Sequence, residues 1–269
     1  MPDPAAAPAP PRRRYLFAAL KNQLDPEQTL ALTLAVRHAV RAGSADRVGL
    51  CPSAAALAWV SGVRGDLELA AQNCGWPASY ALTGETSVRD LAVFSVAYCL
   101  VGHSERRLRL GETEAVVVAR MAALLTAGIH PILCVGESLA QRRADATRSV
   151  LKRQLASARD AFGAAGITPD PARMTVAYEP MWAISTSGSH LEARPQDAAD
   201  AHAVIRDLLD ETFAPSFGAA TSVIFGGGLD PANARSFLSQ PGVDGALVGS
   251  GMHAAPDFLS LVDAFYACA

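Results

Sequence analysis

The sequence predicts an α/β fold, a single-domain (β/α)8 barrel with eight parallel strands, on three observations. The chain has 269 residues, of which 50% are hydrophobic, enough for one large α/β domain or two small ones. From residue 15 onward, short apolar runs alternate with helical segments, and eight such units in about 250 residues match a closed barrel. No G-x-G-x-x-G motif follows the first run, which weakens the alternative of an open, doubly wound dinucleotide-binding sheet.

The strands are predicted where short β-favouring runs end in small or polar residues. They cover Tyr15–Ala19, Arg47–Cys51, Leu67–Ala71, Val96–Val101, His130–Val135, Met174–Tyr178, Val223–Phe225 and Gly245–Val248. Because each helical crossover returns the chain in the same direction, the strands are expected to be parallel.

The intervening segments predict helices. The longer ones cover Pro26–Arg41, Glu112–Ala127, Ala140–Ala161, Asp197–Thr212 and Pro256–Ala267, and the shorter ones Ser53–Val60, Val88–Phe94 and Pro231–Leu238. Two helix starts are marked by an aspartate followed by proline, at Asp25-Pro26 and Asp230-Pro231. This order puts a capping carboxylate before a proline in the first helical position.

The ends and the composition limit the functional classes. Residues 1–14 are rich in Pro, Ala and Arg and predict a flexible tail, which leaves 15–269 for the barrel. The net charge of −3 gives no reason to expect nucleic acid or an anionic membrane as a partner. No apolar run approaches the roughly 20 residues of a membrane span. Five scattered cysteines favour free thiols in a reducing cytoplasm.

Candidate catalytic residues follow the strands, where barrels of this kind carry their chemistry. Lys21, His103 and Glu179 follow the first, fourth and sixth predicted strands. A carboxylate near the apolar Trp182 suits a general base, because desolvation raises its pKa. A histidine can polarise a carbonyl, and an ammonium can stabilise an enediolate. Lys21 stands out further because only it and Lys152 are lysine among 23 cationic residues.

Two glycine-rich strand ends, at 226–228 and 249–251, offer backbone N–H groups to an anion. Together with the candidate catalytic residues they indicate a small phosphorylated carbonyl compound as substrate. No His, Cys and carboxylate cluster has metal-ligand spacing, and we expect neither a metal nor another cofactor.

Two long motifs, VGHSERR at 101–107 and AYEPMWAI at 177–184, resemble the catalytic-histidine and catalytic-glutamate signatures of the triosephosphate isomerase family. Shorter matches are AQN at 71–73, TGE at 83–85, ILCVGE at 132–137 and DGALVG at 244–249. The resemblance covers residues 15–267. It implies a TIM barrel and an isomerase of glycolysis and gluconeogenesis that interconverts glyceraldehyde 3-phosphate and dihydroxyacetone phosphate.

The resemblance also implies roles for individual residues. Glu179 would move a proton between two substrate carbons, and His103 would donate to the carbonyl oxygen as a neutral imidazole. Lys21 would stabilise negative charge, with Glu105 in support. The segment after Glu179 would form a lid over the substrate. The phosphate contacts would be Ser185, Gly228, Gly249 and Ser250. A homodimer would form through the Asn73–Glu85 loop, which would dock near the partner's lysine.

Several positions depart from the family pattern. Ala19 stands where the family has asparagine, which removes a hydrogen-bond donor beside the substrate. The end of the lid reads Ser185–Gly188 with a short insertion before Pro195, Gly228 replaces a serine, and Ser250 replaces a glycine. Two alternatives therefore stay open: an isomerase for another small ketose phosphate, such as an erythrulose phosphate, and a non-catalytic phosphate-binding descendant.

Overall fold

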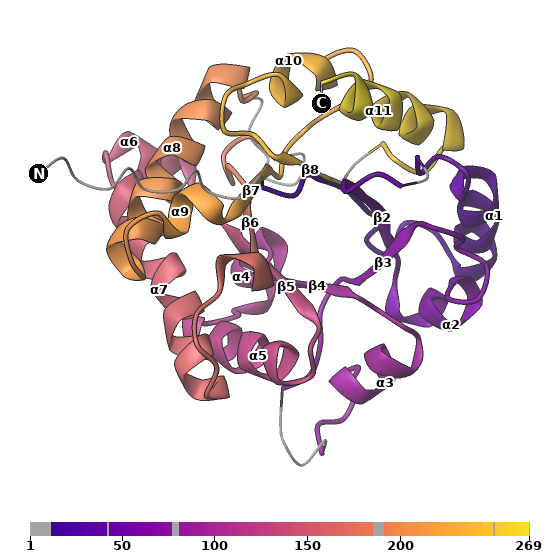
Figure 1. Cartoon of the computed structure of the whole chain (residues 1–269), viewed down its shortest axis with the longest axis horizontal. Helices are drawn as coiled ribbons and strands as arrows, with labels where there is room; N and C mark the ends of the chain where they lie inside the picture. Colours follow the sequence, from indigo (N-terminus) through magenta and orange to yellow (C-terminus); the bar gives the residue numbers. More distant parts are fainter. Residues whose placement is uncertain (1–11, 42, 77–80, 185–190, 250, 269) are drawn as a thin grey trace, which may run out of the picture.

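Eight parallel strands close into a barrel in sequence order, β1 to β8, in this computed structural model (Figure 1). Helices surround the barrel on its outside. The structure describes residues 12–41, 43–76, 81–184, 191–249 and 251–268. The predicted (β/α)8 fold and the parallel pairing of its strands are confirmed.

The strands are short and buried. They are β1 (Tyr15–Ala19), β2 (Arg47–Cys51), β3 (Glu68–Ala71), β4 (Tyr98–Val101), β5 (His130–Val135), β6 (Thr175–Tyr178), β7 (Ser222–Phe225) and β8 (Gly245–Val248). Four have the predicted bounds, and the others differ by one or two residues at their start. Leu67 and Val96 precede their strands because their N–H groups bond to the preceding turns, at Arg64 O and Leu91 O. Both side chains are buried, so the apolar core includes residues that precede the hydrogen-bonded strands.

The helices of the first half of the chain are α1 (Pro26–Val36), α2 (Leu57–Val60), α3 (Val88–Val93), α4 (Ser104–Leu110) and α5 (Glu114–Thr126). The second half has α6 (Leu139–Arg143), α7 (Thr147–Ala165), α8 (Pro195–Thr212), α9 (Phe217–Ala220), α10 (Ala234–Leu238) and α11 (Ala255–Ala267). Short 3₁₀ helices lie at η1 (Ala54–Ala56) and η2 (Pro171–Arg173).

Three predicted helices are wrong in extent. The helix expected over Ala140–Ala161 is two helices, because Asp145 adopts a left-handed φ of 52° between α6 and α7. The helix expected to reach Arg41 ends at Val36, and Arg41 lies over the ring of Tyr266 at 4.3 Å.

The helix expected from Pro231 begins at Ala234. Asp230 accepts hydrogen bonds from the N–H groups of Ala232 and Asn233, so it closes a turn ahead of the helix. At the other predicted start the carboxylate of Asp25 caps α1, accepting from Gln28 N at 2.8 Å. Helix α4, directly after His103, was not predicted.

The two faces of each strand build two apolar layers. Outward side chains such as Leu16 and Val48 pack under the helices in one large cluster. Inward side chains fill the barrel and include Tyr15, Phe17 and Tyr98 near the amino-terminal ends of the strands. Because this filling closes the barrel, ligands can reach only its ends.

The arginines just before β1 contact the amino-terminal end of the barrel. Arg12 Nε donates to Asp244 Oδ1 at 2.9 Å. The carbonyl oxygen of Arg13 accepts a hydrogen bond from Ser222 Oγ at 2.7 Å. Nη2 of Arg14 donates to the carbonyl oxygen of Phe265 at 2.6 Å. The remainder of the predicted tail, residues 1–11, lies outside the described residues.

Candidate active site

Three polar side chains meet at the carboxyl-terminal end of the barrel. Lys21 lies two residues after β1, His103 two residues after β4, and Glu179 directly after β6. All three line one small pocket of about 40 Å³, together with Gly228 and Gly249. The structure therefore brings together most of the site residues that the sequence indicated. Ser185 and Ser250 lie outside the described residues.

Glu179 is held by groups that follow β4. Its side chain is only 5% exposed, Oε1 lies 3.1 Å from His103 Nε2, and Oε2 accepts from Ser104 N at 2.8 Å. Its backbone N–H donates to Val135 O at 2.7 Å. A Cβ on Gly136 would overlap Glu179 O, so glycine is required where β5 meets this backbone. The carboxylate is thus buried and fixed in direction.

Trp182, which we expected beside Glu179 as its desolvating neighbour, is bonded to another carboxylate. Its indole N–H donates to Oε1 of the fully buried Glu137 at 2.9 Å. Glu137 also accepts from the hydroxyl of Tyr178 at 3.1 Å. The strand-end position of Glu137 was visible in the sequence, but its bond to Trp182 was not.

The hydrogen bonds of His103 define which ring nitrogen carries the proton. Nδ1 accepts from Glu105 N at 3.2 Å, so this nitrogen holds a lone pair. The proton of the neutral ring is therefore on Nε2, which faces Glu179 and the pocket. His103 can act there as a hydrogen-bond donor.

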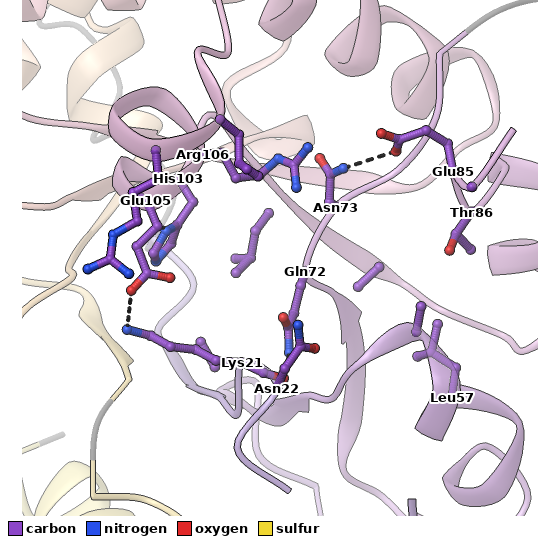
Figure 2. A pocket seen from close by; sticks show the side chains of 17 residues that line it. Lys21, Asn22, Leu57, Gln72, Asn73, Glu85, Thr86, His103, Glu105 and Arg106 are labelled. Carbon is purple, nitrogen blue, oxygen red and sulfur yellow. Dashed lines mark hydrogen bonds and ion pairs between the residues drawn. The ribbon is translucent and has the colours of Figure 1, made fainter. Parts of the chain in front are cut away.

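Lys21 is fixed at both its ammonium and its backbone. Nζ lies 2.8 Å from Glu105 Oε1, as Figure 2 shows. Its φ of 51° is left-handed, and Gln72 Nε2 donates to its carbonyl oxygen at 2.6 Å. Burial alone would raise the pKa of Glu105, but the hydrogen bond and charge of Lys21 lower it below its ordinary value. The pair is thus charged, with the ammonium held at the pocket.

The first glycine after β7, Gly226, approaches Glu179 closely. A Cβ on Gly226 would lie 2.8 Å from Glu179 Cγ, so the close fit excludes larger residues there. The N–H of Gly226 already donates to Tyr178 O at 2.7 Å and is not available to an anion. A Cβ on Gly228 would meet no atom within 4 Å, so this part of the loop borders open space.

A larger cavity of about 490 Å³, whose lining residues Figure 2 shows, adjoins the small pocket. The two share Ala19, Lys21 and His103 as lining residues. Asn73 and Glu85, at the two ends of the predicted docking loop, line its other side. Ala19, where the family has asparagine, thus borders both spaces with a methyl group.

Arg120 joins the two ends of that loop, a role that sequence reasoning missed. The side chain is almost fully buried and bonds to Asn73 Oδ1, to Glu85 Oε1 at 3.2 Å and to Glu112 Oε2 at 2.8 Å. Its guanidinium also lies over the ring of Trp76 at 4.8 Å. An arginine inside an apolar helix pattern resembles a surface residue, and only the fold brings these partners to it.

The described residues include no group of three or more His, Cys, Asp or Glu side chains arranged to hold a metal ion. Over the same part of the chain, no helix has both the length and the apolar character needed to cross a membrane.

Comparisons with known proteins give a consistent result. A family model described as triosephosphate isomerase matches residues 14–265. The triosephosphate isomerase of Solibacter usitatus (strain Ellin6076) is 38% identical over 255 residues, 94% of this chain and 99% of that protein. That of Magnetococcus marinus is 39% identical over 94% of this chain and 98% of its own length. That of Paracidovorax citrulli is 41% identical over 87% of this chain and 91% of its own.

Proposed function

Because this chain belongs to the triosephosphate isomerase family, we propose that it interconverts glyceraldehyde 3-phosphate and dihydroxyacetone phosphate. The observation that carries the proposal is the convergence of Lys21, His103 and Glu179 on one pocket. The named relatives are all triosephosphate isomerases, so neither a different ketose phosphate nor a non-catalytic role is favoured. The reaction is a step of glycolysis and gluconeogenesis.

Glu179 is the proposed base. Its carboxylate removes a proton from the carbon next to the substrate carbonyl, and the electrons of that C–H bond form a carbon–carbon double bond. The carbonyl oxygen then carries the negative charge of an enediolate. The isomerisation is completed when Glu179 returns the proton to the carbon that carried the carbonyl, while the hydroxyl proton on the other substrate carbon moves to the enediolate oxygen and that second oxygen becomes the new carbonyl. The burial of Glu179 and the hydrogen bond that it accepts from Ser104 N support this role, because they hold the carboxylate in one direction.

His103 and Lys21 are the proposed partners of the substrate oxygens. The Nε2–H of His103 points to the carboxylate that takes the proton, so a substrate bound between them would receive this hydrogen bond at its carbonyl. The ammonium of Lys21 would stabilise the enediolate charge, and Glu105 would hold that ammonium in place. Gly228 and Gly249, which line the same pocket, are proposed phosphate contacts, with Ser185 and Ser250 added from the sequence.

The test is a coupled assay of the purified protein with each triose phosphate. We expect turnover in both directions, and we expect Glu179→Asp to lower kcat by about 10²-fold or more, because retracting the carboxylate by one methylene misplaces the base by about 1 Å. Ala19→Asn run alongside measures the cost of the missing amide, with Ala19→Leu as a control of similar size. No turnover of either triose phosphate would overturn the proposal.

We also propose a homodimer in which the Asn73–Glu85 loop of one copy enters the large cavity of the other. Support comes from that cavity beside Lys21 and from two exposed apolar side chains, Leu82 on the loop and Leu110 at the end of α4. Leu110 also lines the cavity. Burying both against a second copy would remove apolar surface from water.

Sedimentation velocity tests the dimer. We expect the unmodified chain to sediment as a dimer and Leu82→Asp to sediment as a monomer with a lower kcat, because a charge would have to be buried in the cavity. Val93→Asp, an equally large change at a strongly exposed position on α3, is the control. A Leu82→Asp protein that remains dimeric at low concentration would contradict this arrangement.

The cytoplasm is the proposed location. All five cysteines are free thiols, and four of them are buried, which supports a reducing compartment.

A further inference from the structure

One guanidinium connects three groups that flank the candidate active site. Arg142 lies in α6, which follows β5. One of its Nη atoms lies 3.3 Å from Glu137 Oε1 and the other 2.8 Å from Asp197 Oδ1. The same guanidinium lies over the ring of Trp182, 4.4 Å from its centroid. Trp182 lies in the connection between β6 and α8, Asp197 lies in the first turn of α8, and Glu137 lies two residues after β5.

The first stem of that connection, residues 179–184, starts at Glu179 and depends on Glu137. The backbone N–H of Met181 donates to Glu137 O at 3.1 Å, and the indole of Trp182 donates to its carboxylate. Glu137 is fully buried, and a buried carboxylate is stable only when it is paired or well hydrogen-bonded. Arg142 supplies its positive charge. The charge on Arg142 therefore stabilises the group that holds Trp182, three residues after Glu179.

The second stem, residues 191–197, ends at Asp197 in the first turn of α8. Asp197 accepts from Arg194 N at 2.9 Å and from Arg194 Nε at 3.1 Å, which fixes the start of the helix. Burial alone would raise the pKa of Asp197, but the hydrogen bonds of Arg194 and the charge of Arg142 lower it. Asp197 is thus an anion, and Arg142 links it to the first stem.

We propose that Arg142 is a positioning residue that ties both stems of the β6–α8 connection to β5, and so keeps Glu179 aligned with the substrate. The proposal rests on the proposed isomerase function. It uses only the two stems, since residues 185–190 lie outside the described part of the chain. An arginine suits this position because a planar guanidinium can bond to two carboxylates and cover an indole at once, whereas an ammonium cannot.

A loosened site has a chemical signature apart from slow turnover. In the enediolate of a triose phosphate, the electrons on oxygen can re-form a carbonyl while the carbon–carbon double bond shifts. The bond from carbon to the phosphate oxygen then breaks, and inorganic phosphate leaves with that electron pair. The remaining three-carbon enol becomes a ketoaldehyde. Inorganic phosphate released per isomerisation therefore reports how well the enediolate is held.

The experiment measures kcat, KM and released phosphate for Asp197→Asn, Arg142→Lys and Arg142→Gln. Asparagine can still accept from Arg194 but loses the charge that pairs with Arg142. We expect about a 5-fold lower kcat for Asp197→Asn, about 10-fold for Arg142→Lys and about 10²-fold for Arg142→Gln, because small misplacements of a base are costly. We expect KM to change by less than about 3-fold and phosphate release per turnover to rise in the same order.

Arg148→Gln is the matched control. Arg148 also bonds from its helix to α8, at Glu211, but this pair is exposed and lies far from both stems in the sequence. We expect wild-type kinetics from it. If Arg142→Gln does not fold, Asp197→Asn and Arg142→Lys still decide the matter. Wild-type kcat and phosphate release in both of these variants would overturn the positioning role, whereas an inactive wild-type protein would overturn the isomerase function itself.

Discussion

The two ends of the barrel each contain an ion pair, and the two pairs lie in different surroundings. At the carboxyl-terminal end, Lys21 and Glu105 are 23% and 25% exposed and border two cavities. At the amino-terminal end, Arg206 and Asp244 are 16% and 7% exposed. Asp244 there also binds Arg12 and accepts from Val223 N at 2.8 Å.

This difference in surroundings predicts that the carboxyl-terminal end of the barrel serves activity and that the amino-terminal end serves stability. At the amino-terminal end, Arg12 and Arg206 donate to the two carboxylate oxygens of Asp244. The aromatic rings of Tyr15, Phe17 and Tyr98 pack nearby, with their centroids within about 6 Å of one another. At the carboxyl-terminal end, polar atoms face space that a ligand can enter. Substitutions should therefore cost activity at one end and folding free energy at the other.

The largest effect should come from Lys21→Met. It removes the ammonium but keeps the length of the side chain, so we expect kcat/KM to fall by about 10³-fold or more, which is about 4 kcal/mol of transition-state stabilisation. The free energy of unfolding, from urea titration, should change by less than about 1 kcal/mol, as for a partly exposed pair. A protein that loses stability more than activity would show that the two ends do not differ in this way.

At the amino-terminal end, Asp244→Asn should lower stability and leave activity nearly unchanged. The variant keeps the shape of the buried side chain but leaves the partly buried guanidinium of Arg206 without its partner charge, so we expect a loss of about 3 kcal/mol in unfolding free energy. kcat measured on the folded fraction should stay within about 2-fold of the wild type, because no group of the pocket is touched. A large fall in kcat at unchanged stability would contradict the comparison.

A smaller effect should come from pH through His202. This side chain is fully buried near the amino-terminal end, where Nδ1 bonds to Gly242 O at 3.1 Å, and burial lowers its pKa to about 4. Below its ordinary pKa of about 6.5 the unfolded chain takes up a proton while the folded chain does not. Stability is therefore full above pH 6.5 and falls as the pH drops toward 4.

Between pH 7 and pH 5 this single group should lower the unfolding free energy by about 2 kcal/mol. His202→Gln does not titrate, so the wild type and the variant should differ in pH dependence by that amount in urea titrations at the two pH values. Equal pH dependence would show that His202 does not contribute in this way.

The sequence was sufficient to predict the barrel and the strand ends that meet at the candidate site. Strand bounds such as Tyr15–Ala19 followed from short apolar runs, because in a parallel sheet covered on both faces nearly every strand residue is apolar. The positions of Lys21, His103 and Glu179 followed from parallel strands that present all their carboxyl ends at one edge. These are local patterns combined with one topological rule.

Contacts between residues far apart in the chain could not be predicted from the sequence. The indole of Trp182 donates to Glu137, a bond that the sequence did not indicate, because β5 and β6 are neighbours and place the two side chains together. Arg120 and Arg142 each bridge groups far apart in the chain, and neither position carries a motif. The break at Asp145 was also hidden, since a left-handed residue in a charged helix pattern has no compositional mark.

The left-handed backbone of Lys21 has a consequence for how this chain responds to selection. A non-glycine residue in that conformation costs about 1 kcal/mol, and glycine would relieve it. A library of variants selected for heat resistance alone should therefore enrich glycine at position 21, while one selected for growth on the reaction should keep lysine. At this position, thermal tolerance and fitness should therefore favour different residues.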